Sequence, residues 1–112
     1  MSAGTADLEF TTWRSIFANY NFRGAEIEIY LTGKQRGIIA EAEFVPDPSD
    51  WDSGSARFVV IPSPVKMAGK IGPDRCWRLS SSVYPRPFFD RDGAVAFSRS
   101  GIGWAKIFAE KK

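Results

Sequence analysis

The sequence predicts an α+β fold in which a short N-terminal helix packs on a curled antiparallel sheet of five to six strands or on a partly closed β-barrel. Apolar and polar residues alternate in several short runs, and one early stretch has helical spacing. Seven Pro and ten Gly are spread through the chain, which is typical of short elements joined by tight turns. The length of 112 residues fits a single compact domain, residues 1–112.

The helix is expected between about Asp7 and Tyr20, after a loose terminus at residues 1–6. Asp7, Thr11 and Thr12 are all acceptable N-caps. Four apolar side chains fall at i, i+3, i+4 and i+7, the spacing of one helical face: Trp13, Ile16, Phe17 and Tyr20. We expect this face to pack on the sheet as core.

A β-hairpin between Ala25 and Val45 is the clearest strand signal, with a loop at residues 33–36. The predicted buried face consists of Ile27, Ile29, Leu31, Ile38, Ala40, Ala42 and Phe44. Closing the loop at residues 33–36 would set Leu31 opposite Ile38 on that face. The other face would then carry like charges directly opposite one another, Glu28 with Glu41 and Glu26 with Glu43, which favours a positive neighbour.

The remaining elements follow from composition. We expect a loop at residues 46–54, a strand at 57–61, a long Pro/Gly-rich loop at 62–75, a strand at 77–84 with Trp77, Leu79, Ser81 and Val83 on one face, a turn at 85–93, and a last hairpin of strands 95–99 and 104–109. Asp92-Gly93 is a strong turn dipeptide.

The net charge of +2 conceals an uneven distribution. Residues 1–56 carry 4 Lys/Arg against 9 Asp/Glu, a balance of −5, whereas residues 57–112 carry 11 against 4, a balance of +7. Either the basic C-terminal strands pack beside the acidic hairpin and screen it, or the two halves present separate faces to different partners.

The residue inventory sets several chemistries aside. The chain has no His and a single cysteine, Cys76, which excludes Ser-His-Asp and Cys-His systems and Cys₄ or iron-sulfur ligation within one chain. We expect Cys76 to be an inert buried thiol, and Asp50 and Asp52 to serve turn chemistry rather than a hard cation. No cofactor, metal or catalytic role is expected, and the hairpin glutamates remain a solvated face without a cleft.

The leading functional hypothesis is a small non-catalytic binding module that interacts with another protein, such as an inhibitor or adaptor of bacterial or phage type. The candidate contact residues are the hairpin glutamates Glu26, Glu28, Glu41 and Glu43 and the aromatic anchors Trp51, Phe88 and Phe89. The sequence shows neither a signal segment nor an apolar run of about 18 residues, so we expect a cytoplasmic protein with no membrane partner.

Two alternatives stay open. The first is single-stranded nucleic-acid binding by the basic half, with phosphate contacts from Arg57, Lys66, Lys70, Arg75, Arg78, Arg86 and Arg91. The second is a homodimer that pairs through an exposed edge strand at residues 104–109.

Overall fold

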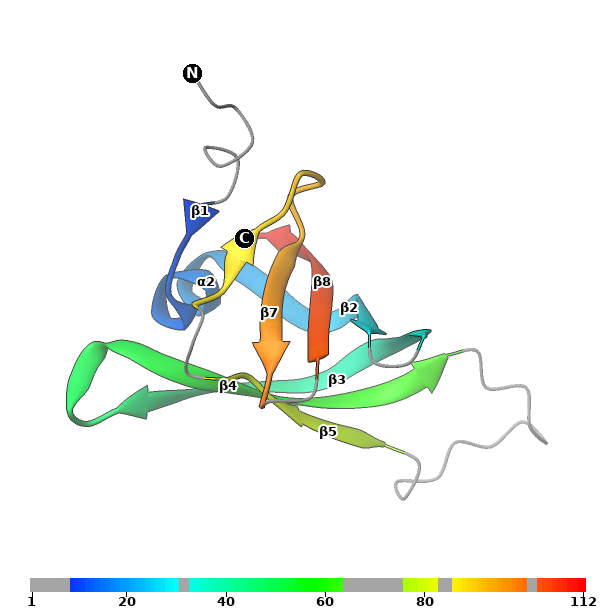
Figure 1. Ribbon diagram of the computed structural model, residues 1–112, viewed down its shortest axis with the longest axis horizontal. Helices are drawn as coiled ribbons and strands as arrows, with labels where there is room; N and C mark the ends of the chain where they lie inside the picture. Colours follow the sequence, from blue (N-terminus) through cyan, green and yellow to red (C-terminus); the bar gives the residue numbers. More distant parts are fainter. Residues whose placement is uncertain (1–8, 31–32, 64–75, 83–85, 101–102) are drawn as a thin grey trace.

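A computed structural model describes residues 9–30, 33–63, 76–82, 86–100 and 103–112. Its elements are β1 (Glu9–Phe10), α2 (Trp13–Asn19), β2 (Tyr20–Tyr30), β3 (Lys34–Asp47), β4 (Asp50–Ser63), β5 (Trp77–Ser80), β6 (Phe88–Phe89), β7 (Val95–Arg99) and β8 (Gly103–Lys111) (Figure 1). Among these residues, no helix is long and apolar enough to cross a membrane.

The strands form one antiparallel sheet in the order β1-β6-β7-β8-β2-β3-β4-β5. The predicted α+β class is therefore confirmed, but five to six strands was too low a number. Strands β1 and β6 have two residues each, too few to show alternation in the sequence, and they pair with one another. Strand β8 lies between β7 and β2, so the edge strand predicted at residues 104–109 is wrong; β1 and β5 are the edges.

The sheet is strongly curled. In Figure 1, β7 and β8 stand nearly upright above the layer that contains β3, β4 and β5, and β2 crosses obliquely behind them. The end of β5 bends back to β7, where Ser81 bridges Arg99. The Ser82 N–H donates to the Ser98 carbonyl over 2.7 Å, and the Ser100 N–H donates to the Ser80 carbonyl over 3.2 Å. The segment after edge strand β5 thus contacts β7, the third strand from the other edge, which gives a half-barrel with a concave inner face.

Helix α2 is shorter than the predicted segment from Asp7 to Tyr20. Thr12 is its N-cap, and the Ser15 N–H donates to Thr12 Oγ1 over 3.1 Å. Before this cap the chain is already paired as β1, and after the helix Tyr20 returns to extended geometry with φ −131°. Strand pairing on both sides therefore limits the helix to seven residues.

Trp13 occupies the centre of the core, as the helical spacing predicts, and is only 2% exposed. Its ring centroid lies 5.1 Å from that of Phe97, 5.7 Å from Phe58, 6.0 Å from Phe17 and 6.4 Å from Phe22. Since these rings come from β7, β4, α2 and β2, the indole joins the helix to strands from both halves of the sheet.

The β2–β3 hairpin exists, but its predicted register is wrong. Glu28 pairs with Arg36, Ile29 with Gln35 and Tyr30 with Lys34, so β3 begins inside the predicted loop. A β-bulge between Ile39 and Glu41 then shifts the alternation of β3 by one residue.

The bulge explains why the predicted buried face of β3 is only partly right. Before it, Ile39 is fully buried and Ile38 is 38% exposed, contrary to the prediction. Beyond it, Ala42 and Phe44 pack against the core as predicted. Leu31 lies outside the described residues.

Residues 46–54 do not form the predicted loop, because β3 and β4 continue as a long ribbon to a turn at Pro48 and Ser49. The Ser49 N–H and hydroxyl both donate to Asp47 Oδ1, over 2.9 and 2.8 Å, which is an Asx turn. Strand β7 matches the prediction. Strand β5 is shorter than the strand predicted at 77–84, because it ends at Ser80; Leu79 within it and Ser81 just after it, predicted on one face, are both buried. The loop at residues 64–75 lies outside the described residues.

We predict that Trp13→Ala lowers the free energy of unfolding by about 3–5 kcal/mol, because it leaves a large cavity among four aromatic rings. Trp13→Phe is the matched control, since it keeps an aromatic ring and removes an indole N–H that has no hydrogen-bond partner. It should cost less than half as much in chemical denaturation. If both variants lose the same free energy of unfolding, packing of an aromatic ring at position 13 is not the main source of the loss.

A second stability prediction concerns Gly37, which is buried in β3. A Cβ there would collide with Val60 Cγ1 and lie 2.8 Å from the Ile61 carbonyl oxygen, a backbone atom that cannot move away cheaply. Gly37→Ala should therefore lower the free energy of unfolding by about 1–3 kcal/mol. Gly33→Ala, where nothing lies within 4 Å, should change it by less than about 0.5 kcal/mol.

Candidate functional site

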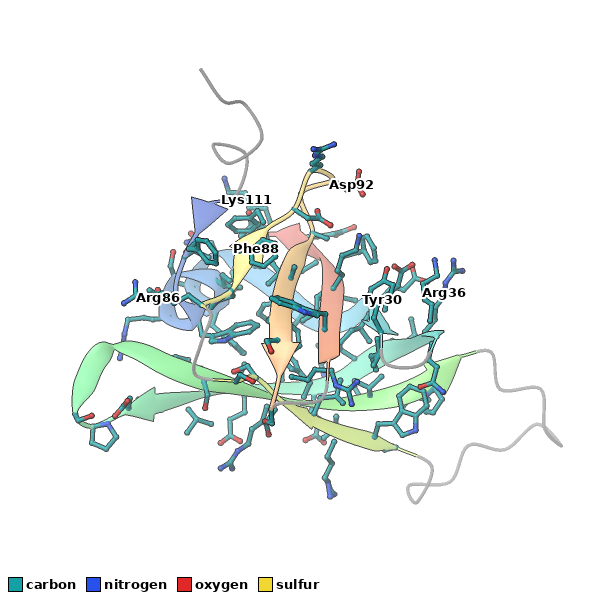
Figure 2. All side chains as sticks on the ribbon, viewed as in Figure 1. Tyr30, Arg36, Arg86, Phe88, Asp92 and Lys111 are labelled. Atoms are coloured by element: carbon teal, nitrogen blue, oxygen red, sulfur yellow. The ribbon has the colours of Figure 1, made fainter. Side chains whose placement is uncertain are left out.

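Exposed aromatic side chains gather on the outer surface of β1, β6 and β8. Phe10 is 55% exposed, Trp104 42% and Phe108 37%. The Phe10 and Phe88 ring centroids lie 5.4 Å apart, and those of Phe88 and Trp104 lie 5.8 Å apart. We call Phe10, Phe88, Trp104 and Phe108 the aromatic face; Figure 2 labels Phe88 within it.

Strand register puts these side chains on one side of the sheet. Phe10 pairs with Phe88, Phe88 with Ala96, and Ala96 with Lys106. Trp104 and Phe108 lie two residues either side of Lys106, so they share its face. The Lys106 ammonium lies 5.8 Å from the Phe108 ring centroid. The four aromatic side chains therefore share one side of the sheet and come from several strands.

Phe88 and Phe89, which were both predicted as anchors, point to opposite faces of the sheet. Phe88 belongs to the aromatic face, whereas Phe89 points inward and packs against the core, 5.5 Å from the Tyr20 ring. Adjacent residues of a strand point to opposite faces, so only one of the pair is available on the outside.

Ion pairs border the aromatic face. Lys106 Nζ lies 2.9 Å from Asp90 Oδ2. Glu28 Oε2 lies 3.6 Å from Arg36 Nε and 3.8 Å from Lys34 Nζ. Figure 2 shows Arg36 beside Tyr30 at the edge of this surface. Each of these three cations therefore has a carboxylate within 4 Å.

These contacts shift the pKa values of the groups involved. The Tyr30 hydroxyl donates to Glu28 Oε1, and this bond lowers the pKa of Glu28 despite partial burial, with help from the nearby cations. The same bond raises the pKa of Tyr30. The salt bridge to Asp90 likewise raises the pKa of Lys106.

Asp90 also holds the turn between β6 and β7. Its Oδ1 accepts from the Asp92 N–H over 2.9 Å and from the Ala94 N–H over 2.8 Å. Burial alone would raise the pKa of Asp90, but the hydrogen bonds from Lys106 and from these two N–H groups lower it overall. The carboxylate thus stays charged and fixes Lys106 beside the aromatic rings.

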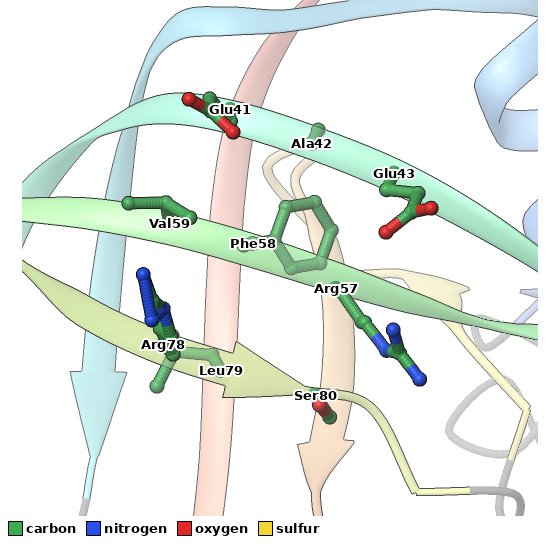
Figure 3. A pocket seen from close by; sticks show the side chains of 9 residues that line it. All are labelled: Glu41, Ala42, Glu43, Arg57, Phe58, Val59, Arg78, Leu79 and Ser80. Atoms are coloured by element: carbon green, nitrogen blue, oxygen red, sulfur yellow. The ribbon is translucent and has the colours of Figure 1, made fainter.

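A second outer surface combines other predicted residues. Glu41, Glu43, Arg57 and Arg78 line a shallow groove of about 600 Å³ over β3, β4 and β5 (Figure 3). Glu43 pairs with Arg57 in register, and Arg78 pairs with Val59. Within the described part of the chain, no ion pair joins these glutamates to these arginines. The groove is therefore of mixed charge, and Ala42, Phe58, Val59 and Leu79 add apolar lining.

The four predicted glutamates do not form facing pairs. Glu26 pairs with Ile38 and Glu28 with Arg36, while Glu41 and Glu43 face Val59 and Arg57 on β4. The predicted like-charge pairing is wrong, because the actual register and the bulge separate the glutamates.

The basic candidates also lie apart. Arg57 and Arg78 line the groove, whereas Arg91 is exposed in the turn between β6 and β7, at the opposite side of the molecule from β5 (Figure 1). Arg86 is exposed just before β6 (Figure 2). Outside the described residues are Lys66, Lys70, Arg75 and the side chain of Trp51. The described arginines thus do not form one continuous track.

The sequence analysis missed Phe10, Trp104 and Phe108 as surface residues. A signal was present in β8, where Trp104, Lys106 and Phe108 alternate with Ala105, Ile107 and Ala109. Because Lys106 marks the solvent side of this pattern, the two large aromatics beside it belong to that side as well. Phe10 gave no such signal, since β1 has only two residues.

No protein-family model, curated protein or solved structure matches this chain. Among the described residues, no group of three or more Asp, Glu or Cys side chains is arranged to hold a metal ion. The side chains of Asp50 and Asp52 lie outside that set.

We predict that Asp90→Asn lowers the free energy of unfolding at neutral pH by about 1–2 kcal/mol, because it removes the charge that pairs with Lys106 and keeps an oxygen for the turn. The pKa of Asp90 is lower in the folded than in the unfolded state. The native protein should therefore exceed Asp90→Asn in free energy of unfolding by the full amount above about pH 5. This difference should shrink as the pH falls below about 4. Denaturation at several pH values measures the difference.

Asp92→Asn is the control, since Asp92 is exposed in the same turn. It should change the free energy of unfolding by less than about 0.5 kcal/mol. A pH-independent loss in Asp90→Asn would contradict the assigned role of the charge.

Proposed function

We propose that the protein is a small non-catalytic binding module whose aromatic face binds another protein, as an inhibitor or adaptor would. The observation that supports this proposal is the exposure of Phe10, Trp104 and Phe108 on one side of the sheet, where the Phe10 and Trp104 rings both contact Phe88. Soluble domains rarely leave large neighbouring aromatics in water without a partner. Trp is also enriched among the residues that dominate binding energy at protein interfaces.

The charges around the aromatic face favour an apolar, nearly neutral partner surface. Lys34 and Arg36 are paired with Glu28, and Lys106 is paired with Asp90. A nucleic acid would need free cations for its phosphates, and its binding depends on releasing counterions. Lys34, Arg36 and Lys106 already have carboxylate partners, so these three cations favour phosphate contact less than the rings favour contact with a protein, while Arg86 and Arg91 beside β6 are exposed.

The carboxylates support a non-catalytic role. Glu28 is the glutamate of the hairpin with the most neighbouring charges, and its pKa is lowered by Tyr30 and by the cations. A general acid near neutral pH needs the opposite shift. The site is therefore suited to holding a fixed charge pattern beside an apolar contact surface.

The test begins with affinity purification of the tagged protein from its native cells, followed by titration of the purified partner. Trp104→Ala should weaken binding by about 30-fold or more, the loss expected when a hot-spot side chain is truncated. The native affinity should fall by less than about tenfold between 50 and 200 mM salt, because the contact is apolar.

Arg57→Ala is the matched control, since Arg57 is exposed on the other outer surface. It should leave the affinity within about threefold of the native value. Thermal unfolding of both variants checks that the fold is intact. The proposal fails if Trp104→Ala binds normally, if the protein binds a single-stranded oligonucleotide with steep salt dependence, or if the aromatic face instead pairs two copies of this chain.

A further inference from the structure

Strand β2 carries a wide bulge where it runs beside β8. Residues 22–25 of β2 lie opposite Ala109 alone, between two regular pairs of the β2–β8 ladder. Within the bulge, Gly24 has φ 87°, a backbone conformation that suits glycine, and Phe22 turns inward to the core, where it is 5% exposed. Bulges redirect side chains and are over-represented next to functional sites.

The bulge leaves a hollow of about 250 Å³ on the outer surface of β2 and β8, lined in part by Glu26, Phe108 and Glu110. Glu26 pairs with Phe108 in register, and Glu110 is two residues from Phe108 on β8. These three side chains therefore lie on the same side of the sheet as Trp104. The hollow thus adjoins the aromatic face at Phe108.

The two glutamates of the hollow are accessible and have no cation beside them. Glu26 and Glu110 are both exposed, and no ion pair within the described ranges of the chain includes either of them. In contrast, Glu28 and Asp90, which also border the aromatic face, are paired with cations. The border of the aromatic face is therefore acidic at Phe108.

The cations nearest to the hollow are held by other groups. Arg23 is the only cation among the described residues that line it, and its Nε donates to the Ala40 carbonyl of β3 over 3.3 Å. Lys106 lies 5.8 Å from the Phe108 ring centroid, but its Nζ is paired with Asp90. Two carboxylates and one tethered guanidinium give the lining a net negative charge.

The size and the lining of the hollow define the group that fits it. Small-molecule sites commonly measure about 300–1,000 Å³, so a hollow of about 250 Å³ suits a single side chain. A guanidinium is planar and can stack on an exposed ring such as Phe108. Its N–H groups point in several directions within one plane, so it can also donate to carboxylates on two strands, Glu26 and Glu110.

We infer that the protein partner of the aromatic face inserts an arginine side chain into this hollow. The guanidinium stacks on Phe108 and donates hydrogen bonds to Glu26 and Glu110. The inference rests on the proposed function, because it assigns the chemistry of the partner at the same surface. One arginine at the edge of an otherwise apolar contact keeps the partner surface nearly neutral.

The first measurement is the affinity of the purified partner for two glutamine variants. Glu26→Gln and Glu110→Gln should each weaken binding by about fivefold or more, because each removes a charge-assisted hydrogen bond. The loss should be smaller at about 500 mM salt than at about 50 mM, since salt screens exposed charges.

Glu43→Gln is the matched control, because Glu43 is an exposed glutamate on the other outer surface. It should leave the affinity for the partner within about twofold of the native value. Thermal unfolding of all three variants should match that of the native protein, since these side chains are exposed.

The second measurement needs no partner. The ¹⁵N-labelled protein is titrated with N-acetyl-arginine amide, and the citrulline analogue is the uncharged control of similar shape. The arginine probe should shift the backbone signals of Glu26, Phe108 and Glu110 saturably, and the citrulline probe should bind at least about fivefold more weakly. Glu26→Gln should weaken binding of the arginine probe, whereas Glu43→Gln should not.

The inference is overturned if Glu26→Gln and Glu110→Gln bind the partner as the native protein does, or if Glu43→Gln loses as much affinity as they do. It is also overturned if the citrulline probe binds as tightly as the arginine probe. Normal partner binding by the glutamine variants, together with a loss in Trp104→Ala, would remove the arginine contact and leave the proposed function standing. If Trp104→Ala binds the partner normally, the proposed function fails, and the probe titration still decides whether the hollow accepts a guanidinium.

Discussion

The packing of Trp13 against Phe22, Phe58 and Phe97 is the interaction on which the rest of the structure depends. The Phe rings belong to β2, β4 and β7, no two of which are neighbours in the sheet. A flat sheet could not bring all three onto one indole. The short helix, fixed by its Thr12 cap, therefore provides the apolar centre around which the sheet curls.

The curl of the sheet determines which of its surfaces remain accessible. With the inner face filled by core side chains, the chain offers two outer surfaces and one open end. One outer surface carries the aromatic face with its bordering ion pairs, and the other carries the mixed-charge groove around Arg57. The end away from the helix holds Arg99, whose Nε and Nη1 atoms have no hydrogen-bond partner. The three regions differ in polarity.

Much of the fold could be predicted from local patterns. The spacing of Trp13 and Ile16 predicted a buried helical face, and the alternation from Val95 to Arg99 predicted β7 with its correct bounds. Prediction failed where pairing is decided by distant residues. The bulge before Glu41 reverses the alternation of β3, and the short strand at Phe88 exists only because β1 and β7 lie on either side of it.

The sequence alone determined the α+β class, the composition of the core and the absence of His, because these depend on residue identity and local period. The tertiary structure decided which side chains meet. Glu28 lies among Tyr30, Arg36 and Lys106 rather than opposite Glu41, and Trp104 lies beside Phe88. Such contacts depend on strand order and register, and a shift in register changes every cross-strand neighbour while leaving the local pattern intact.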